Sequence, residues 1–130
     1  NFLSTGFFLT VNFLKKYKII TQEGYEMAIT VTVMYPNISG SKFDMDYYLG
    51  AHFDLVGKLW GPKLLSARAI KGIVTPDLDT PPPYQVVAIF ELENVEDLQS
   101  LIAEHGAEVM GDIPNFTDVA PVMQISENLA

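Results

Sequence analysis

Cysteine is absent from this chain of 130 residues, which excludes disulfide bonds, thiolate nucleophiles and metal sites with cysteine ligands. Basic residues are scarce too: eight lysines and arginines stand against sixteen aspartates and glutamates, and the formal net charge at pH 7 is −8. A field of this sign repels nucleic acids and anionic membrane surfaces. We therefore expect a cytoplasmic protein whose partners include neither a nucleic acid nor a membrane.

The motifs of the common metal and nucleotide sites are also missing. The two histidines, His52 and His105, form no His-x-x-x-His or Glu-x-x-His pattern, and no triplet of carboxylates occurs, so we expect no dedicated metal site. No glycine-rich phosphate loop follows a predicted strand, and no serine has the context of a nucleophile elbow. We expect no cofactor, although one histidine is enough to ligate a haem and the sequence leaves that group open.

Residues 1–26 differ in composition from the rest of the chain. Their apolar run is interrupted by Ser, Thr, Asn and Lys, so it is too short to span a bilayer, and its lysines follow the apolar residues, the reverse of a secretory signal. We predict an N-terminal extension over residues 1–26 and one domain over residues 27–130. Alternatively, apolar side chains of the extension cover a patch on the domain or on a partner: Phe7, Phe8, Phe13 and Leu14.

Four segments have the period of β-strands and two have that of α-helices. The predicted strands are residues 28–35, 64–74, 84–93 and 119–126, and the predicted helices are residues 45–60 and 94–106. The order β-α-β-β-α-β is typical of the ferredoxin-like fold, an α+β architecture with two helices on one face of an antiparallel four-stranded sheet. Apolar residues such as Val87 and Ile89 also occur on the other face. We therefore predict a homodimer through this sheet face, a dimeric α+β barrel.

Local signals mark the ends of both predicted helices. Asp44 and Asn94 are the predicted N-caps, because their side chains can accept hydrogen bonds from the first free N–H groups. Gly106 is predicted to end the second helix, which would leave His105 exposed at its C-terminus. In the first helix an apolar row lies beside a row that contains the histidine: Leu49, Phe53, Val56 and Trp60, then Tyr48, His52, Leu55 and Leu59.

His52 is the main candidate for chemistry, because an ordinary histidine pKa of about 6.5 suits proton transfer at neutral pH. It lies one turn after Tyr48, and Asp112, in the segment before the last strand, is the predicted partner that orients it. Tyr35 and Tyr48 are predicted to line a pocket, whereas Tyr47, about 100° further round the helix, is placed at the helix edge or the dimer seam. The alternative is structural: a buried histidine that binds a backbone carbonyl and joins helix to loop.

Three blocks of the chain resemble the EthD family, which belongs to the dimeric α+β barrel superfamily and is named for a protein of ethyl tert-butyl ether degradation. The blocks are VTVMYPN, FDMDYYLGAHFDLV and GDIPNFTDVAPVMQISE, and the resemblance spans about residues 28–127. The matched positions are Tyr35, Pro36, Phe43, Asp44, Tyr47, Tyr48, His52, Asp112, Pro114, Asn115, Phe116 and Thr117. From this match Asn115 and Phe116 join the expected ligand-binding residues, although the family often carries Tyr at the position of Phe116, which here lacks that hydroxyl.

The resemblance implies an association with the oxidative degradation of ethers, and related small barrels include cofactor-free monooxygenases, isomerases and cyclases that act on aromatic compounds. It suggests a cofactor-independent enzyme or accessory factor for small apolar oxygenated compounds, with His52 as acid/base and Asp112 as its orienting partner. As an enzyme, the protein would be associated with oxidoreductase chemistry or would be a lyase or isomerase. The alternative is a non-catalytic ligand-binding or structural dimer, with His52 in a hydrogen-bond network between helix and loop.

Overall fold

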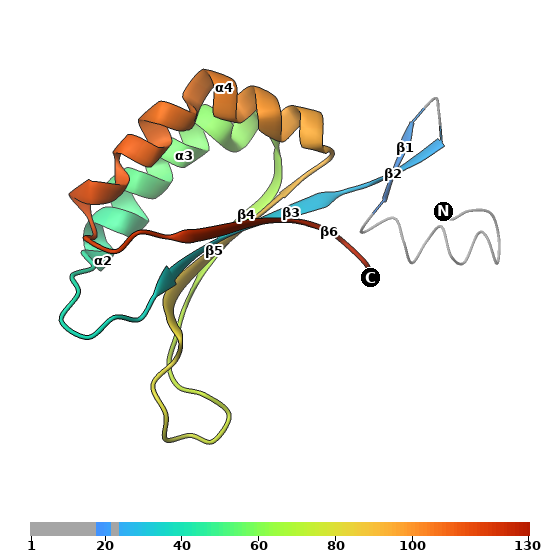
Figure 1. Ribbon diagram of the computed structural model, residues 1–130. Helices are drawn as coiled ribbons and strands as arrows, with labels where there is room; N and C mark the ends of the chain where they lie inside the picture. The colour runs from blue at the N-terminus through green and yellow to red at the C-terminus, as the bar shows by residue number, and fades with distance from the viewer. Residues whose placement is uncertain (1–17, 22–23) are drawn as a thin grey trace.

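The computed structural model describes residues 18–21 and 24–130 (Figure 1). Its elements are β1 (Lys18–Thr21), β2 (Gly24–Met27), β3 (Ile29–Pro36), α2 (Met45–Tyr47), the π-helical turn η1 (Tyr48–His52), α3 (Phe53–Trp60), the 3₁₀ turn η2 (Gly61–Lys63), β4 (Leu64–Lys71), β5 (Tyr84–Leu92), α4 (Val95–Gly111), the 3₁₀ turn η3 (Ile113–Asn115) and β6 (Val122–Glu127). The strands β1 and β2 pair with each other in a separate antiparallel sheet. The predicted packing role of Phe7, Phe8, Phe13 and Leu14 lies outside the described residues. Within the described ranges, no helix has the length and apolarity needed to cross a membrane.

The main sheet has the strand order β4-β5-β3-β6, and every neighbouring pair is antiparallel. The helices α3 and α4 arch over one of its faces (Figure 1). In the register, Val31 lies between Phe90 of β5 and Ile125 of β6. This is the ferredoxin-like arrangement, so the predicted fold is confirmed.

Two groups of buried side chains fill the space between the helices and the sheet. The first, along the middle of both helices, comprises Ile29, Val31, Val56, Trp60, Ala88, Phe90, Leu92, Leu98, Leu101 and Val109. The second lies where β3 leads into α2 and comprises Tyr35, Tyr48, Val86, Ile113 and Phe116. Aromatic rings dominate this second group, and Tyr35 has Phe43, Tyr48 and Phe116 as edge-on neighbours at centroid distances of 5.3 to 5.9 Å. Such edge-to-face contacts favour a defined arrangement of rings.

The outer face of the sheet, away from the helices, is less apolar than the sequence suggested. One row across the four strands is apolar: Ile70, Val87, Met34 and Val122. The next two rows are mixed and then polar: Arg68, Ile89, Thr32 and Gln124, followed by Ser66, Glu91, Thr30 and Ser126. Val87 and Ile89 lie on this outer face as predicted, but only one of the three rows is apolar throughout, and the sheet-to-sheet dimer stays a prediction.

A π-helical turn interrupts the first helix at Tyr48–His52, and the sequence did not indicate it. The N–H of Phe53 bonds to the carbonyl of Tyr48 five residues earlier, so the turn holds one residue more than an α-helical turn. Because of this extra residue, the buried residue one turn before Phe53 and Val56 is the one that precedes the predicted position. Leu49, predicted in the buried row, is 56% exposed, whereas Tyr48 and His52 are buried with Val56 and Trp60.

The second helix, α4, runs past the predicted stop at Gly106 and ends at Gly111. A glycine alone does not stop a helix when the apolar period continues, and Val109 is buried in the same row as Leu98 and Leu101. The prediction of His105 at a helix C-terminus was therefore wrong. Asp112 is the C-cap of this helix rather than a residue of an open loop.

The predicted N-cap at Asp44 is confirmed, because its Oδ1 accepts a hydrogen bond of 3.0 Å from the N–H of Tyr47. We expect Asp44→Ala to lower the free energy of unfolding by about 1 kcal/mol, since it leaves this N–H without its acceptor. Urea denaturation measures the difference. Asp44→Asn keeps the accepting oxygen and serves as control; an equal loss in both variants would contradict the capping role.

Candidate functional site

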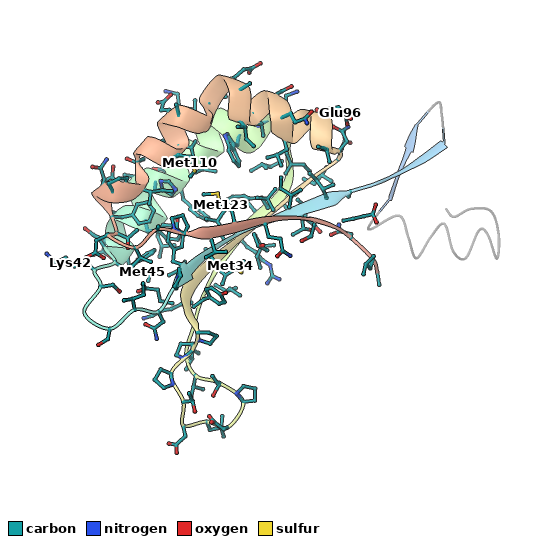
Figure 2. All side chains as sticks on the ribbon, viewed as in Figure 1. Met34, Lys42, Met45, Glu96, Met110 and Met123 are labelled. Carbon is teal, nitrogen blue, oxygen red and sulfur yellow. The ribbon has the colours of Figure 1, made fainter. Side chains whose placement is uncertain are left out.

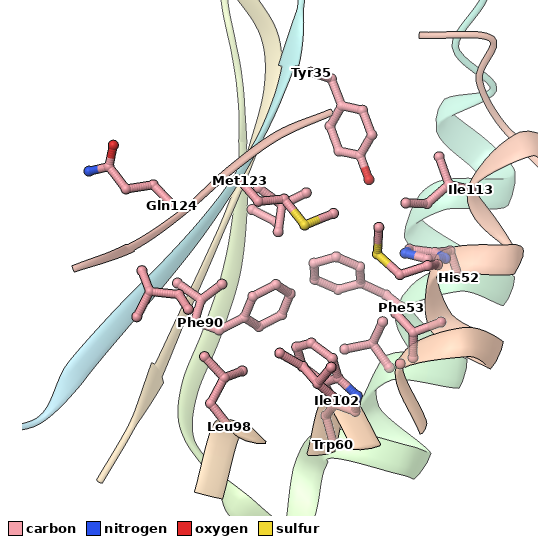
Figure 3. A pocket seen from close by; sticks show the side chains of 18 of the residues that line it. Tyr35, His52, Phe53, Trp60, Phe90, Leu98, Ile102, Ile113, Met123 and Gln124 are labelled. Carbon is pink, nitrogen blue, oxygen red and sulfur yellow. The ribbon is translucent and has the colours of Figure 1, made fainter. Parts of the chain in front are cut away.

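A cavity of about 510 Å³ lies between the helices and the sheet (Figure 3). Its wall is mostly apolar and includes Val31, Val33, Phe53, Val56, Ala88, Phe90, Leu98, Ile102, Val109, Met110, Ile113, Met123 and Ile125. Tyr35, Tyr48, His52 and Trp60 are its polar lining residues, whereas the side chain of Gln124, which also borders the cavity, points away from it (Figure 3). An apolar pocket of this size with a few convergent polar groups is typical of a small-molecule site.

His52 is 5% exposed and comes from the end of the π-helical turn. Its Nδ1 lies 2.9 Å from Oδ2 of Asp112, which follows α4 sixty residues later in the sequence. The structure thus brings together the histidine and the carboxylate that the sequence analysis proposed as a pair. The partner of the ring is a carboxylate, and it is not the backbone carbonyl of the structural alternative.

The carboxylate of Asp112 is itself held from the other side. Tyr47 donates its hydroxyl proton to Oδ1 at 2.7 Å, and the Asn115 side-chain amide donates to the same oxygen at 2.8 Å. Burial raises the pKa of the Asp112 carboxyl, but hydrogen bonds from Tyr47, Asn115 and His52 together outweigh burial and lower the pKa below its usual value. Asp112 is therefore ionised at neutral pH and accepts the Nδ1 proton of the imidazole.

This contact decides which nitrogen of His52 is available for chemistry. An ionised carboxylate accepts hydrogen bonds and donates none, so the neutral imidazole carries its proton on Nδ1. The other nitrogen, Nε2, then has a free lone pair, and it has no hydrogen-bond partner among the described residues. Because His52 lines the cavity, this nitrogen lies where it can accept a hydrogen bond or a proton from a bound molecule.

Tyr35 and Tyr48 add hydroxyl groups to the same region. Burial raises the pKa of Tyr48 to about 12, and burial and the neighbouring Tyr48 raise the pKa of Tyr35, so both hydroxyls stay protonated at neutral pH. The Tyr35 hydroxyl points into the cavity on the side of His52 (Figure 3). The Tyr48 ring stacks on the His52 ring at a centroid distance of 5.7 Å. The Tyr48 hydroxyl is buried without a partner among the described residues.

The other expected ligand-binding residues, Asn115 and Phe116, contact the His52–Asp112 pair outside the cavity lining. Asn115 holds Asp112, and the ring of Phe116 contacts the His52 ring at a centroid distance of 4.6 Å. Neither residue lines the cavity. Tyr47, placed by the sequence analysis at the helix edge or dimer seam, instead donates to Asp112. Its only signal in the sequence was its place in the Tyr-Tyr pair of the EthD-like block, because a contact across 65 residues leaves no local pattern.

Among residues 18–21 and 24–130, no three side chains of the His, Cys, Asp and Glu types lie together as a metal site would require. No protein-family model and no curated protein matches the chain.

Solved structures, in contrast, resemble it along most of its length. An EthD-like protein from Ralstonia eutropha is 36% identical, with a TM-score of 0.75 over 79% of this chain and 93% of that one. An ethyl tert-butyl ether degradation (EthD) family protein from Bacillus halodurans is 17% identical, with a TM-score of 0.64 over 79% and 100%. A cofactor-independent oxygenase from Streptomyces nogalater is 8% identical, with a TM-score of 0.52 over 79% and 93%, and shares the fold alone.

The lowered pKa of Asp112 makes the stability of the protein depend on pH. Its ionised form stabilises the fold at neutral pH, and this contribution is lost as the pH falls from about 4 through the folded-state pKa. We expect Asp112→Asn to be less stable than wild type at pH 7 and to approach wild type below about pH 4. Urea unfolding of both proteins at a series of pH values between pH 7 and about pH 3 measures the difference in the free energy of unfolding.

Tyr47→Phe removes one of the donors and is expected to give a smaller difference with the same pH dependence. A deficit of Asp112→Asn that stays constant from pH 7 to about pH 3 would show that the carboxylate charge is not what stabilises this contact.

Proposed function

The chain belongs to the EthD-like family, and on this premise we propose that it is a cofactor-independent enzyme, or an accessory factor of oxidative degradation, for small apolar oxygenated compounds such as ethers or aromatics. The observation that carries the proposal is the His52–Asp112 pair at the wall of an apolar cavity. A general base in such a place acts on a molecule that is mainly hydrocarbon and has an acidic proton near an oxygen.

The chemistry that these residues support is a proton transfer. His52 Nε2 takes a proton from a C–H group next to a carbonyl, the electron pair of that bond forms a C=C bond, and the carbonyl π electrons move onto the oxygen to give an enolate. From a hydroxyl group, the same nitrogen takes the proton and the charge stays on the hydroxyl oxygen. The Tyr35 hydroxyl, which stays protonated and points into the cavity, hydrogen-bonds that oxygen as its charge grows. Asp112 keeps the ring oriented and stabilises the imidazolium until the proton is returned.

Two features favour this role over a purely structural histidine. The carboxylate on Nδ1 leaves Nε2 without a hydrogen-bond partner among the described residues, so this nitrogen is available to a bound molecule. The histidine also lines a cavity of about 510 Å³ rather than a filled junction. The proposed ligand therefore meets a base that is already oriented.

Hydrogen exchange at a carbon acid tests the proposed proton transfer. With phenylacetone in D₂O, we expect the protein to accelerate loss of the methylene proton signal in NMR spectra, and His52→Ala to slow this exchange by about 100-fold or more. His105→Ala is the matched control, because His105 lies on α4 beside Glu104 and does not line the cavity. Equal exchange rates in wild type and His52→Ala would remove His52 from the proposed role.

We also propose a homodimer through the outer face of the sheet. The support is its apolar row of Ile70, Val87, Met34 and Val122, in which Ile70 and Val122 are each 46% exposed. A row of this kind is more stable against a copy of itself than in water, because the contact removes apolar surface from solvent.

Light scattering at micromolar concentration is expected to give twice the chain mass of 14.4 kDa. Val87→Glu is expected to give a monomer, because it places a charge in the middle of the apolar row. Ser66→Glu, in the polar row of the same face, is the control and is expected to remain a dimer. A monomeric wild type would contradict the dimer.

A further inference from the structure

Four apolar side chains stand half exposed where the cavity opens between α4 and β6. Ile102 and Met110 of α4 are 51% and 43% exposed, and Met123 and Ile125 of β6 are 42% and 54% exposed. All four also line the cavity that contains His52. Met110 and Met123 lie on the two sides of the space between helix and sheet (Figure 2). The apolar lining thus continues from the buried site to the surface of the protein.

The position of β6 at the edge of the sheet explains why its two apolar side chains in this strip of four, Met123 and Ile125, are half exposed. Met123 pairs with Val33 and Ile125 pairs with Val31, so all four side chains share the helix-facing side of the sheet. Val31 is only 5% exposed, because the helices cover the central strands, whereas β6 is the edge strand and extends beyond them. Gly106 and Ala107, two small residues of α4, also line the cavity.

The cavity also lacks any group that would pair with a charged ligand. No aspartate, glutamate, lysine or arginine is among the described residues that line it. At the His52 end, the imidazole and the Tyr35 hydroxyl can both meet a ligand oxygen (Figure 3). Away from this end, the indole N–H of Trp60 is a further lining donor that has no partner among the described residues. An ionised ligand would lose its hydration here without compensation. The lining therefore favours an uncharged molecule that is polar at one end.

We propose that the cavity takes an elongated, uncharged lipophile, with its oxygen-bearing end at His52 and its hydrocarbon chain between α4 and β6. This inference rests on the proposed function and adds the shape and polarity of the ligand. The hydrocarbon chain of the ligand is what would cover the four half-exposed side chains, because these side chains also line the cavity that contains His52. Burying the chain against them removes apolar surface of both partners from water.

A series of phenols with one head group and growing chains tests the proposal. Calorimetry with 4-ethylphenol, 4-butylphenol and 4-hexylphenol is expected to give an affinity that rises about fourfold for each added methylene, or about 15-fold for each step in the series. Ile125→Ser is expected to reduce the gain in affinity from butyl to hexyl severalfold, which is a larger effect than the one it has on the affinity for 4-ethylphenol. Met123→Gln, on the same strip, is expected to do the same.

Ile38→Ser is the matched control, because Ile38 lies in the loop after β3 and is 53% exposed, close to the 54% of Ile125. Ile38→Ser is expected to show the same rise in affinity from 4-butylphenol to 4-hexylphenol as wild type. Affinity for 4-ethylphenol that depends on His52, without any gain from longer chains, would overturn the elongated ligand and leave the proposed function standing. No binding of any phenol, or a change of molecular mass in Ile125→Ser with an unchanged gain, would also overturn it.

Discussion

The hydrogen bond between His52 Nδ1 and Asp112 Oδ2 joins the two helical segments that cover the sheet. His52 ends the π-helical turn of the first segment, and Asp112 caps the C-terminus of the second. A buried carboxylate is stable only when its polar atoms have hydrogen-bond partners. Tyr47 and Asn115 meet this condition for the carboxylate. The same contact therefore sets the helix ends over the sheet and selects the imidazole nitrogen that remains free at the cavity.

The cavity follows from the way in which helices cover a four-stranded sheet. At one end, Tyr35, Phe43, Tyr48 and Phe116 fill the space with interlocking rings. Towards the edge strand β6, the cavity is lined by side chains that stay half exposed, among them Met123 and Ile125. The His52–Asp112 pair lies at the boundary between the filled and the open part. His52 in this place borders the cavity while its partner Asp112 is held by Tyr47 and Asn115 on the other side.

Membership of the EthD-like family accounts for the fold. It does not identify the reaction, because the ferredoxin-like fold hosts many activities. The relative from Ralstonia eutropha shows the family, whereas the oxygenase from Streptomyces nogalater, at 8% identity, shows only the architecture. The proposed chemistry therefore rests on this chain's own residues. Phe116 illustrates the point, since it carries no hydroxyl and contacts the His52 imidazole through its ring.

The amino-acid sequence by itself determined the order of strands and helices, the helix cap at Asp44 and the residue types at the site, because hydrophobic period and capping are local properties. It did not reveal the π-helical turn, the continuation of α4 through Gly106 or the role of Tyr47. Only the tertiary structure decided these. Packing against the sheet selects among helical registers of similar energy, and the Tyr47–Asp112 contact joins residues that no local pattern connects.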